Sequence, residues 1–385
     1  MSQYGARGRA LAGQDSTTIL AHYYQGATFG SIAPSTRIRV RVLSQWRATA
    51  SKPLVIYGRT TQWSIDGIAK TFPIDAKLRV TPTTTTTSSG TKTTWRIRVT
   101  APTGAILHDG TKPATFVIRG ATGSSRLQLY SKPGTYDRYR GILRVRTSSV
   151  TPTVTVVNEL ALDVYLRGVV PVEMPSTWPT EALKAQAIAA RSYAARRLRP
   201  GVSYYDVTDD SRSQVYRGTL GEKATTNLII TSTAGVVLKS GSSIANTLFH
   251  STGGGATEHN ENVFVSSTGA KVSTPVSYLR GSVDRATDGS TFDAAAPYAT
   301  WRTKTYTLAQ LSAFFATDAR TNVGILTALD LRDRGVSGRY RSVTLIGSAG
   351  SKKVSGDVFR VVFNAARPTT DPLLRSTLFA LAPVP

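Results

Sequence analysis

Apolar and charged residues alternate one by one in several stretches of the first half of the chain. The clearest cases are 37–42, which reads RIRVRV, and 95–99, which reads WRIRV. Successive side chains of a strand point to opposite faces, so this alternation predicts strands with one cationic face and one buried face. Further short apolar runs predict strands at 54–57, 115–118 and 143–146. The region 37–157 is therefore expected to be β-rich, and the Thr/Ser run at 83–90 is expected to form a hairpin tip or a flexible insertion.

Helical patterns lie on both sides of this region. Residues 180–196 are rich in alanine, the best helix former, and Glu181 suits the first turn. A shorter helical pattern within 6–24 has possible capping residues at 16–18. The remaining expectations are a helix at 308–315, a helix or a buried strand at 225–233, and strands at 236–238, 342–346 and 358–363. The fold class is thus α+β, with a β-rich N-terminal half and a mixed α+β catalytic core.

The net charge of +24 over 385 residues changes the picture, because such a surface attracts polyanions. Nucleic acid, anionic membranes and anionic wall polymers are the candidates, although a solvated sheet face is the simpler interpretation of the arginine-rich strands. No recognisable nucleic-acid-binding fingerprint accompanies the charge. The absence of cysteine excludes disulfides and thiolate metal sites. No apolar run approaches the roughly 20 residues of a membrane span.

A carboxylate stands between two prolines in the segment 169–179, VVPVEMPSTWP. Glu173 is expected at an apolar strand-to-loop junction just before the alanine-rich helix. Burial among Val, Met and Trp side chains raises the pKa of a carboxyl group, which then keeps the proton that a general acid needs. Residue type alone favours the simpler interpretation, in which Glu173 caps the following helix.

The alanine-rich helix itself offers polar groups for a ligand. Gln186 and Tyr193 lie two turns apart on one side of it, and Arg191 lies at the flank. Gln186 is suited to bind a sugar amide or hydroxyl. The alternative is a face that packs against a sheet, with Gln186 bonded to the backbone.

A second polar segment follows at 207–218. Asp209 or Asp210 is a candidate to orient a cation or a hydroxyl, and Gln214 and Tyr216 are expected to share a strand face. The alternative is an Asp-Asp-Ser turn that leads into a strand.

A glycine-rich loop, HSTGGGATEH, begins at His250. Its glycines let the backbone come close to a ligand, and His250 is expected at the end of an apolar strand, where it suits a pocket. The neighbouring Ser251 suggests a hydrolase only weakly, because adjacent side chains rarely face each other. A metal site at His250 and His259 is the weaker interpretation, with Glu258 and Glu261 as the nearby carboxylates.

In combination and in this order, these segments resemble the stage II sporulation protein D (SpoIID/LytB) family, whose members include amidase enhancers and related wall proteins. The resemblance covers nearly the whole chain and is weakest over 48–150, where only the strand pattern matches. The matching segments are 1–6 (MSQYGA), 158–166, 170–175 (VPVEMP), 183–193, 213–218 (SQVYRG), 233–235 (TAG), 249–254 (FHSTGG), 338–340, 355–360 and 374–377.

The resemblance implies a lytic transglycosylase that acts on peptidoglycan glycan strands. In that reaction one Glu protonates the glycosidic oxygen and then, as a carboxylate, deprotonates the C6 hydroxyl of muramic acid, which closes an anhydro ring; ordinary glycoside hydrolysis needs two carboxylates. Glu173 matches the family's catalytic Glu. The alternative is a non-catalytic, wall-binding enhancer of an N-acetylmuramoyl-L-alanine amidase. The residues expected to bind substrate are Gln186, Arg191, Tyr193, Asp210, Gln214, Tyr216, His250, Ser251 and Gly254.

The resemblance also sets expectations for cofactors, partners and location. Some relatives bind zinc near the glycine-rich loop through Cys and His; without Cys, we expect neither a metal nor a cofactor here. The expected partners are glycan strands, a wall amidase and anionic wall polymers, and nucleic acid is disfavoured. The family's opening motif usually continues upstream of the position of Met1, so we expect further native residues there, including an export signal, and an extracellular or cell-wall location. The expected divisions are 1–36 (N-terminal part of the family core), 37–157 (β-rich region with an inserted subdomain) and 158–385 (catalytic core and closing strands).

Overall fold

The computed structural model describes residues 1–112 and 114–381, and it has the expected mixed α+β composition. The chain forms two compact units. One unit is Thr28–Thr247, and the other combines Met1–Ala27 with the chain from Leu248 onward. The first unit is therefore inserted, in sequence, into the second.

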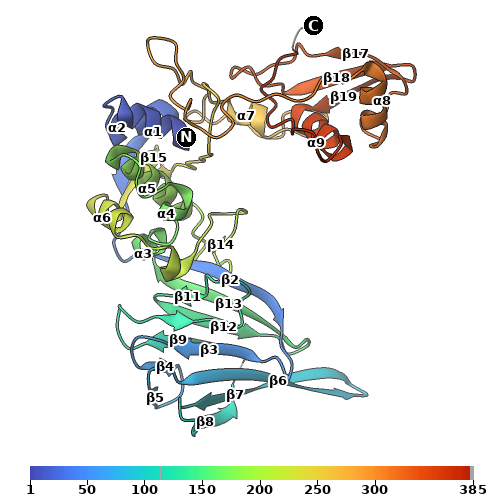
Figure 1. The fold of residues 1–385 in the computed structure, drawn as a ribbon. Coiled ribbons are helices and arrows are strands. Elements are labelled where there is room, and N and C mark those ends of the chain that lie inside the picture. Colours follow the sequence, from blue (N-terminus) through green and yellow to red (C-terminus); the bar gives the residue numbers. More distant parts are fainter. Residues whose placement is uncertain (113, 382–385) are drawn as a thin grey trace. The chain divides into compact units, whose positions relative to one another are not determined.

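Two large sheets form the β-rich part of the inserted unit (Figure 1). In each sheet, buried apolar residues alternate with exposed or half-buried polar ones; in β2, for example, Ile38, Val40 and Val42 are buried between arginines. The seven-stranded sheet has the order β14 (Val207–Thr208), β2 (Arg37–Arg47), β13 (Thr153–Ala161), β12 (Ile142–Thr147), β9 (Thr115–Gly120), β4 (Trp63–Ile65) and β5 (Thr71–Phe72). The six-stranded sheet has the order β11 (Arg138–Tyr139), β10 (Leu127–Gln128), β3 (Leu54–Gly58), β6 (Lys77–Thr87), β7 (Gly90–Thr100) and β8 (Ile106–Thr111).

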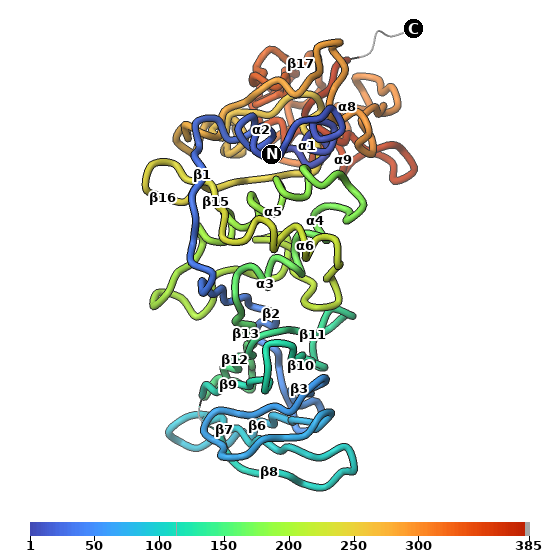
Figure 2. Tube along the Cα trace, turned by 90° about the vertical axis from the view of Figure 1, so that its left-hand side faces the viewer, coloured from blue at the N-terminus to red at the C-terminus, as the bar shows by residue number. Residues whose placement is uncertain are grey.

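The strands predicted from alternation are confirmed. Strands β2, β3, β7, β9 and β12 contain the five stretches singled out from the sequence. The Thr/Ser run lies at the end of the long β6–β7 hairpin, where Thr83 to Thr87 pair with residues 90–94. Figure 1 shows this hairpin as two long neighbouring strands, and Figure 2 traces the backbone of the same region from a view turned by 90°.

A helical layer completes the inserted unit. Its centre is α5 (Thr180–Ala195), the alanine-rich helix predicted from the sequence, which packs against α3, α4, α6 and β15. Its small side chains allow this close packing on several sides. The surrounding elements are α3 (Leu162–Leu166), α4 (Val170–Glu173), the 3-10 helix η1 (Gly218–Gly221), α6 (Ala224–Ser232) and a three-stranded sheet of β1 (Thr28–Ser31), β15 (Val236–Ser240) and β16 (Ser243–Ile244).

A buried guanidinium ties this layer together. Arg191 of α5 is fully buried, and its Nε donates to Oδ1 of Asp163 in α3 at 2.6 Å. Its terminal nitrogens donate to the carbonyl oxygens of Ile230 in α6 and Val236 in β15, at 3.2 and 3.1 Å. Burial lowers the pKa of Arg191 and the negative charge of Asp163 opposes this. One side chain thus joins α5 to three other elements.

The second unit contains several helices and a small three-stranded sheet. Strands β17 (Leu326–Asp330), β18 (Ser342–Gly347) and β19 (Gly350–Ser355) form an antiparallel sheet, and α8 (Leu308–Ala316) and α9 (Gly356–Ala366) share its apolar core. The other helices are α1 (Gln3–Leu11), α2 (Ser16–Tyr23) and α7 (Asn260–Val263).

A buried carboxylate fixes α1 and α2 in this unit. Asp284 is fully buried; it accepts hydrogen bonds from Nε of Arg9 at 2.8 Å and from the hydroxyl of Tyr23 at 2.5 Å. Gly5 leaves room for these groups, since a Cβ there would lie 2.1 Å from both Oδ2 of Asp284 and the Tyr23 hydroxyl oxygen. The glycine of the MSQYGA motif is therefore a packing requirement.

One prediction of secondary structure is wrong in this unit. Residues 358–363 lie in helix α9 and not in a strand, because Phe359, Val362 and Phe363 make a helical stripe and Ser355 caps the first turn. The helical pattern within 6–24 is confirmed by α2, although its cap is Asp15, which accepts from the N–H of Thr18, and not a residue of 16–18. The helix expected at 308–315 and the strand expected at 342–346 are confirmed, and 225–233 is a helix.

We expect Arg191→Ala to lower the free energy of unfolding by roughly 3 kcal/mol, because it leaves Asp163 and two carbonyl groups without their donor. The control is Lys184→Ala on the same helix, which removes only a half-exposed pair with Glu181 and is expected to cost less than about 0.5 kcal/mol. Urea unfolding of the full chain measures both. Equal losses for the two variants would contradict a central role for Arg191.

Candidate functional site

The segment that carries Glu173 folds into a single short helix. Val169, Val170 and Met174 are fully buried and anchor α4, and Pro171 favours its first turn. Glu173 is the last residue of α4 and is half-buried. The expected strand-to-loop junction is therefore wrong, since the N–H groups of Glu173 and Met174 bond back to Val169 and Val170 in helical fashion.

The following helix begins after Pro179. Pro179 is the N-cap of α5 and makes no side-chain capping hydrogen bond. Glu173 ends the preceding helix, α4.

Buried polar and aromatic groups lie in electrostatic reach of Glu173. The hydroxyl of Tyr165 donates to Oε1 of Gln214 at 3.2 Å, and the Tyr165 ring lies 4.9 Å from that of Tyr216. Burial raises the pKa of Tyr165 well above its ordinary value, and the charges of Tyr216, Tyr193 and Glu173 act in the same direction. Tyr165 thus stays a neutral donor at any physiological pH.

This cluster continues into the sheet. The hydroxyl of Tyr216 donates to Oδ1 of Asn158 at 3.0 Å, and Nδ2 of Asn158 donates to the carbonyl oxygens of Arg140 and Ile142. Nε2 of Gln214 donates to the carbonyl oxygen of Ala190 in α5 at 3.3 Å. The chain of bonds therefore links β13, the 209–217 loop and α5.

The sequence predicted that Gln214 and Tyr216 share a strand face, and this prediction is wrong. Only Val207–Thr208 is a strand, β14, and the chain then turns at Asp209 and Asp210. The turn interpretation is right for these two residues. The cause is local hydrogen bonding: Asp210 accepts from the hydroxyl of Thr208 and the N–H of Arg212, which closes a turn in place of a ladder.

Three expected substrate-binding residues have different surroundings. Arg191 is fully buried and bonded within the helical layer, as described above. Tyr193 is buried on the same helix, with the guanidinium of Arg197 3.3 Å from its ring centre. Asp210 is partly exposed and pairs with Arg212, whose hydrogen bonds lower the pKa of the Asp210 carboxyl group.

Gln186 stands out among the buried polar groups. Its side chain is 0% exposed, and neither Oε1 nor Nε2 has a hydrogen-bond partner in the described part of the chain. The interpretation that Gln186 bonds to the backbone is therefore wrong. Burying an amide without hydrogen bonds lowers the free energy of unfolding by about 1–3 kcal/mol. Such groups usually bind a ligand or a water molecule.

The glycine-rich loop belongs to the other unit. His250 is exposed and is not at the end of a strand; its backbone pairs only in an isolated bridge with Ser2. Ser251 is also exposed, and its carbonyl oxygen accepts from the N–H of Tyr4. The N–H of Gly254 donates to Oδ2 of Asp293 at 2.5 Å.

Asp293 occupies the backbone donors of this loop. Its carboxylate accepts from the hydroxyl of Thr252 and from the N–H groups of Gly254 and Gly255. A third donor, the N–H of Gly253, bonds to the hydroxyl of Ser2. The glycines therefore bring the backbone close to a protein carboxylate.

The carboxylates of the weaker metal interpretation are also engaged by the protein. Glu258 accepts from the hydroxyl of Ser337 at 2.6 Å and Glu261 pairs with Arg280 at 2.5 Å. Nδ1 of His259 accepts from the N–H of Gly281. Within residues 1–112 and 114–381, no group of three His, Cys, Asp or Glu side chains is arranged to hold a metal ion.

The cluster around Glu173 coincides with a region of similarity to known proteins. Residues 151–239 match the family described as stage II sporulation protein, SpoIID. This part of the chain is thus similar to that family. The matching segment includes Glu173, Asn158, Tyr165, Gln214 and Tyr216, whereas the glycine-rich loop lies outside it.

Two curated proteins are similar to part of the chain. An uncharacterized protein of Brachyspira hyodysenteriae is 37% identical over 114 residues, which are 29% of this chain and 31% of that protein. The amidase enhancer of Bacillus subtilis is 40% identical over 102 residues, which are 26% of this chain and 14% of that protein. The chain thus spans less than a third of either relative. No solved structure matches.

The sequence did not predict every member of the cluster around Glu173. Asn158 and Tyr165 were not among the expected site residues, although a polar Asn inside the apolar run VTVVNELAL of β13 is a visible signal of a buried hydrogen bond. Asp163, the partner of Arg191, gave no such signal, because its partner lies 28 residues away.

Gly168, which follows α3, packs closely against Tyr216 of the cluster around Glu173. A Cβ at this position would lie 2.6 Å from Cε2 of Tyr216 and 2.7 Å from the carbonyl oxygen of Gly218. We therefore expect Gly168→Ala to lower the free energy of unfolding by about 1–3 kcal/mol through overpacking. Gly123→Ala is the matched control, since nothing lies within 4 Å of its Cβ position. Urea unfolding measures both, and an unchanged Gly168→Ala midpoint would contradict the packing of Tyr216 on Gly168.

Proposed function

We propose that this chain is a peptidoglycan lytic transglycosylase with Glu173 as its acid and base. The observation that carries the proposal is the position of Glu173: a half-buried carboxylate on a helix anchored by Val169, Val170 and Met174, within the SpoIID match. A rigid, partly desolvated carboxyl group suits a step that needs first a proton donor and then a proton acceptor.

The proposed reaction conserves its protons. Protonated Glu173 gives its proton to the glycosidic oxygen as the bond from that oxygen to C1 of muramic acid breaks. The Glu173 carboxylate then takes the proton of the C6 hydroxyl, whose oxygen bonds to C1. The product carries an anhydro ring, Glu173 is protonated again, and no water is consumed.

We propose that Gln186 contributes to binding of the glycan. Its unpaired amide can both donate and accept, which matches the acetamido groups of the glycan. Tyr193, Asp210, Gln214 and Tyr216 stay candidate contacts or supports of this site. Arg191 acts on it through α5 and is a positioning residue.

His250, Ser251 and Gly254 stay proposed substrate-binding residues from the second unit. The exposed side chains of His250 and Ser251 are available to a polar ligand. A transglycosylase acts on a substrate outside the membrane, so we propose an extracellular or cell-wall location. No helix in the described residues is long and apolar enough to cross a membrane.

A second candidate function is favoured by one relative. The B. subtilis protein that is similar to part of the chain is named an amidase enhancer. This chain would then bind the wall and stimulate an N-acetylmuramoyl-L-alanine amidase without cleaving glycan itself. The two functions differ in whether Glu173 is needed.

Glu173→Gln tests the transglycosylase. We expect it to lower the formation of anhydro-muramic ends by at least about a hundredfold, because it removes both the acid and the base. Mass spectrometry of purified glycan strands incubated with the full chain measures these ends. The control is Glu181→Gln. Glu181 is a carboxylate on α5 that pairs with Lys184, and this variant is expected to cleave normally. Cleavage by a pure Glu173→Gln protein would sink the assignment.

The enhancer function has its own test. A purified wall amidase is assayed on sacculi with the wild-type chain and with Glu173→Gln. A glycan-cleaving role predicts that any stimulation falls with the variant, because shorter strands are no longer produced. Full stimulation by Glu173→Gln, without anhydro ends from the wild type, would establish the enhancer in place of the enzyme.

A further inference from the structure

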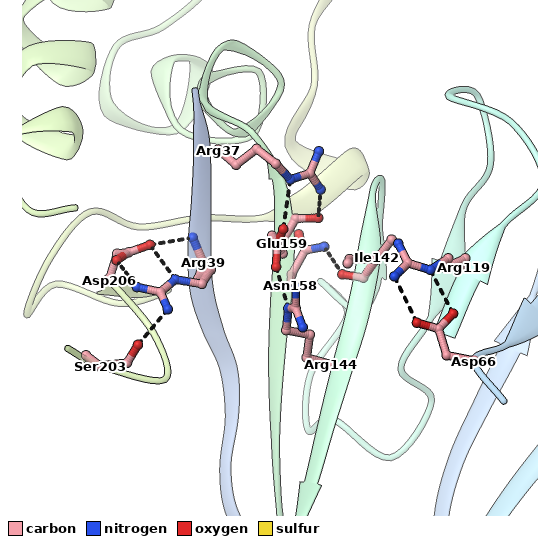
Figure 3. Close-up of polar contacts among 10 residues, drawn as sticks. All are labelled: Arg37, Arg39, Asp66, Arg119, Ile142, Arg144, Asn158, Glu159, Ser203 and Asp206. Carbon is pink, nitrogen blue, oxygen red and sulfur yellow. Dashed lines mark hydrogen bonds and ion pairs between the residues drawn. The ribbon is translucent and has the colours of Figure 1, made fainter. Parts of the chain in front are cut away.

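The seven-stranded sheet carries several carboxylates among its exposed arginines. Arg37 and Arg144 both point to Glu159 (Figure 3). The same view shows two further pairs of that face, Arg39 with Asp206 and Arg119 with Asp66. Arg41 and Arg146 of this face lie over the rings of Tyr205 and Tyr204 instead.

On the exposed face of the six-stranded sheet, two of four neighbouring cations are paired. Lys77 and Arg79 of β6 and Arg96 and Arg98 of β7 point to the same side, and Asp109 of β8 pairs with Arg96 and Arg98. Asp109 bonds to both Arg96 and Arg98. The guanidinium of Arg79 has no ion-pair partner among residues 1–112 and 114–381.

Two like charges also face each other across the strands. Arg79 is paired directly with Arg98 in the antiparallel register. Residues that face each other in this way have Cβ atoms roughly 5 Å apart, and like charges there destabilise the sheet. An anion bound between them would remove this repulsion.

The same residues surround a hollow large enough for a ligand. A cavity of about 420 Å³ is lined by Lys77, Arg79, Arg96 and Arg98 together with Ala50, Thr81 and Thr100. A second cavity of about 480 Å³ shares Arg96 with the first and is also lined by Asp109, Thr83, Thr94 and Thr111. Both cavities are open to solvent, and we call the two together the groove.

The groove fits a polymer of phosphodiesters. Alternate residues of a strand lie roughly 7 Å apart, so Lys77 and Arg79 of β6, which line the first cavity, present charges at that repeat. A polymer with one phosphodiester per short polyol unit carries its charges at a similar repeat. Arginine binds phosphate oxygens well because its donors form a planar fork, and the threonine hydroxyls can bond to the polyol.

The groove does not suit nucleic acid. Strands without regular pairing are bound largely by stacking of bases on aromatic rings. Trp95, in the lining of the second cavity, is 4% exposed and donates its indole N–H to the carbonyl oxygen of Ser148. No aromatic side chain among the described residues lines the first cavity, and Tyr57, beside Lys77, packs against Arg59 and Tyr130.

We propose that the exposed face of β6 and β7 binds a polyol phosphate polymer, the chemistry of an anionic wall polymer. This site lies outside residues 151–239, the SpoIID match, and does not use Glu173. It holds the protein on the wall independently of glycan cleavage.

The test is binding of the full chain to purified poly(glycerol phosphate) teichoic acid across a salt series. The variant Arg79→Gln/Arg98→Gln is expected to bind about tenfold more weakly at low salt, with a flatter salt dependence, because two phosphate contacts are lost. The matched control is Arg285→Gln/Arg302→Gln, which removes the same charge from two exposed arginines of the other unit and is expected to bind like the wild type. Glu173→Gln is also expected to bind normally, so failure of glycan cleavage leaves this result unaffected.

Two competing polymers make the test specific. A single-stranded DNA oligonucleotide and polyglutamate are each measured at matched charge. Equal or tighter binding of the DNA would overturn the polyol phosphate, and equal binding of polyglutamate would show general attraction by the net charge. Unchanged binding by Arg79→Gln/Arg98→Gln would overturn the site itself. If this double variant failed to fold, Arg79→Gln alone, which breaks no ion pair, gives the same comparison.

Discussion

The helical layer around α5 depends on one buried guanidinium. Arg191 neutralises Asp163 and donates to the carbonyl oxygens that end α6 and begin β15, so α5 is fixed to three elements at once. The same helix accepts a hydrogen bond from Gln214 at Ala190 and carries Gln186 and Tyr193. A buried charge tolerates little displacement, because each lost bond exposes an uncompensated group to a low-dielectric interior. Because Arg191 fixes α5, it also fixes the positions of the side chains on α5 that belong to the cluster near Glu173.

Local signals in the sequence predicted much of the fold. The alternation around Arg37 to Val42 and the alanine content of α5 both act within one element, where neighbouring residues decide the outcome. The prediction failed at 358–363, where β-branched residues and a helical stripe coexist and the cap at Ser355 decides between them. It failed again at Gln214 and Tyr216, because the side chain of Asp210, which precedes them, closes a turn by accepting from the N–H of Arg212.

The candidate site was predicted less completely, for a different reason. Glu173 is visible because two prolines and an apolar stretch mark it locally. The bonds that surround it join residues far apart in the chain: Tyr216 meets Asn158 across 58 residues and Arg191 meets Asp163 across 28. The glycine-rich loop shows the same limit, since the carboxylate that fills it, Asp293, comes about 40 residues later. No periodicity in the sequence encodes such partners.

The nesting of one unit inside the other sets an order for folding. Arg9 and Tyr23 must find Asp284, whose codon is read long after theirs, so α1 and α2 have no partner while the chain is being made. Closing so long a loop is entropically costly when the loop is flexible. The inserted unit removes that flexibility, because β1 at its beginning pairs with β15 near its end, Thr28 opposite Lys239. Once this pairing forms, the two halves of the outer unit are held close to one another, and the long loop becomes a short one.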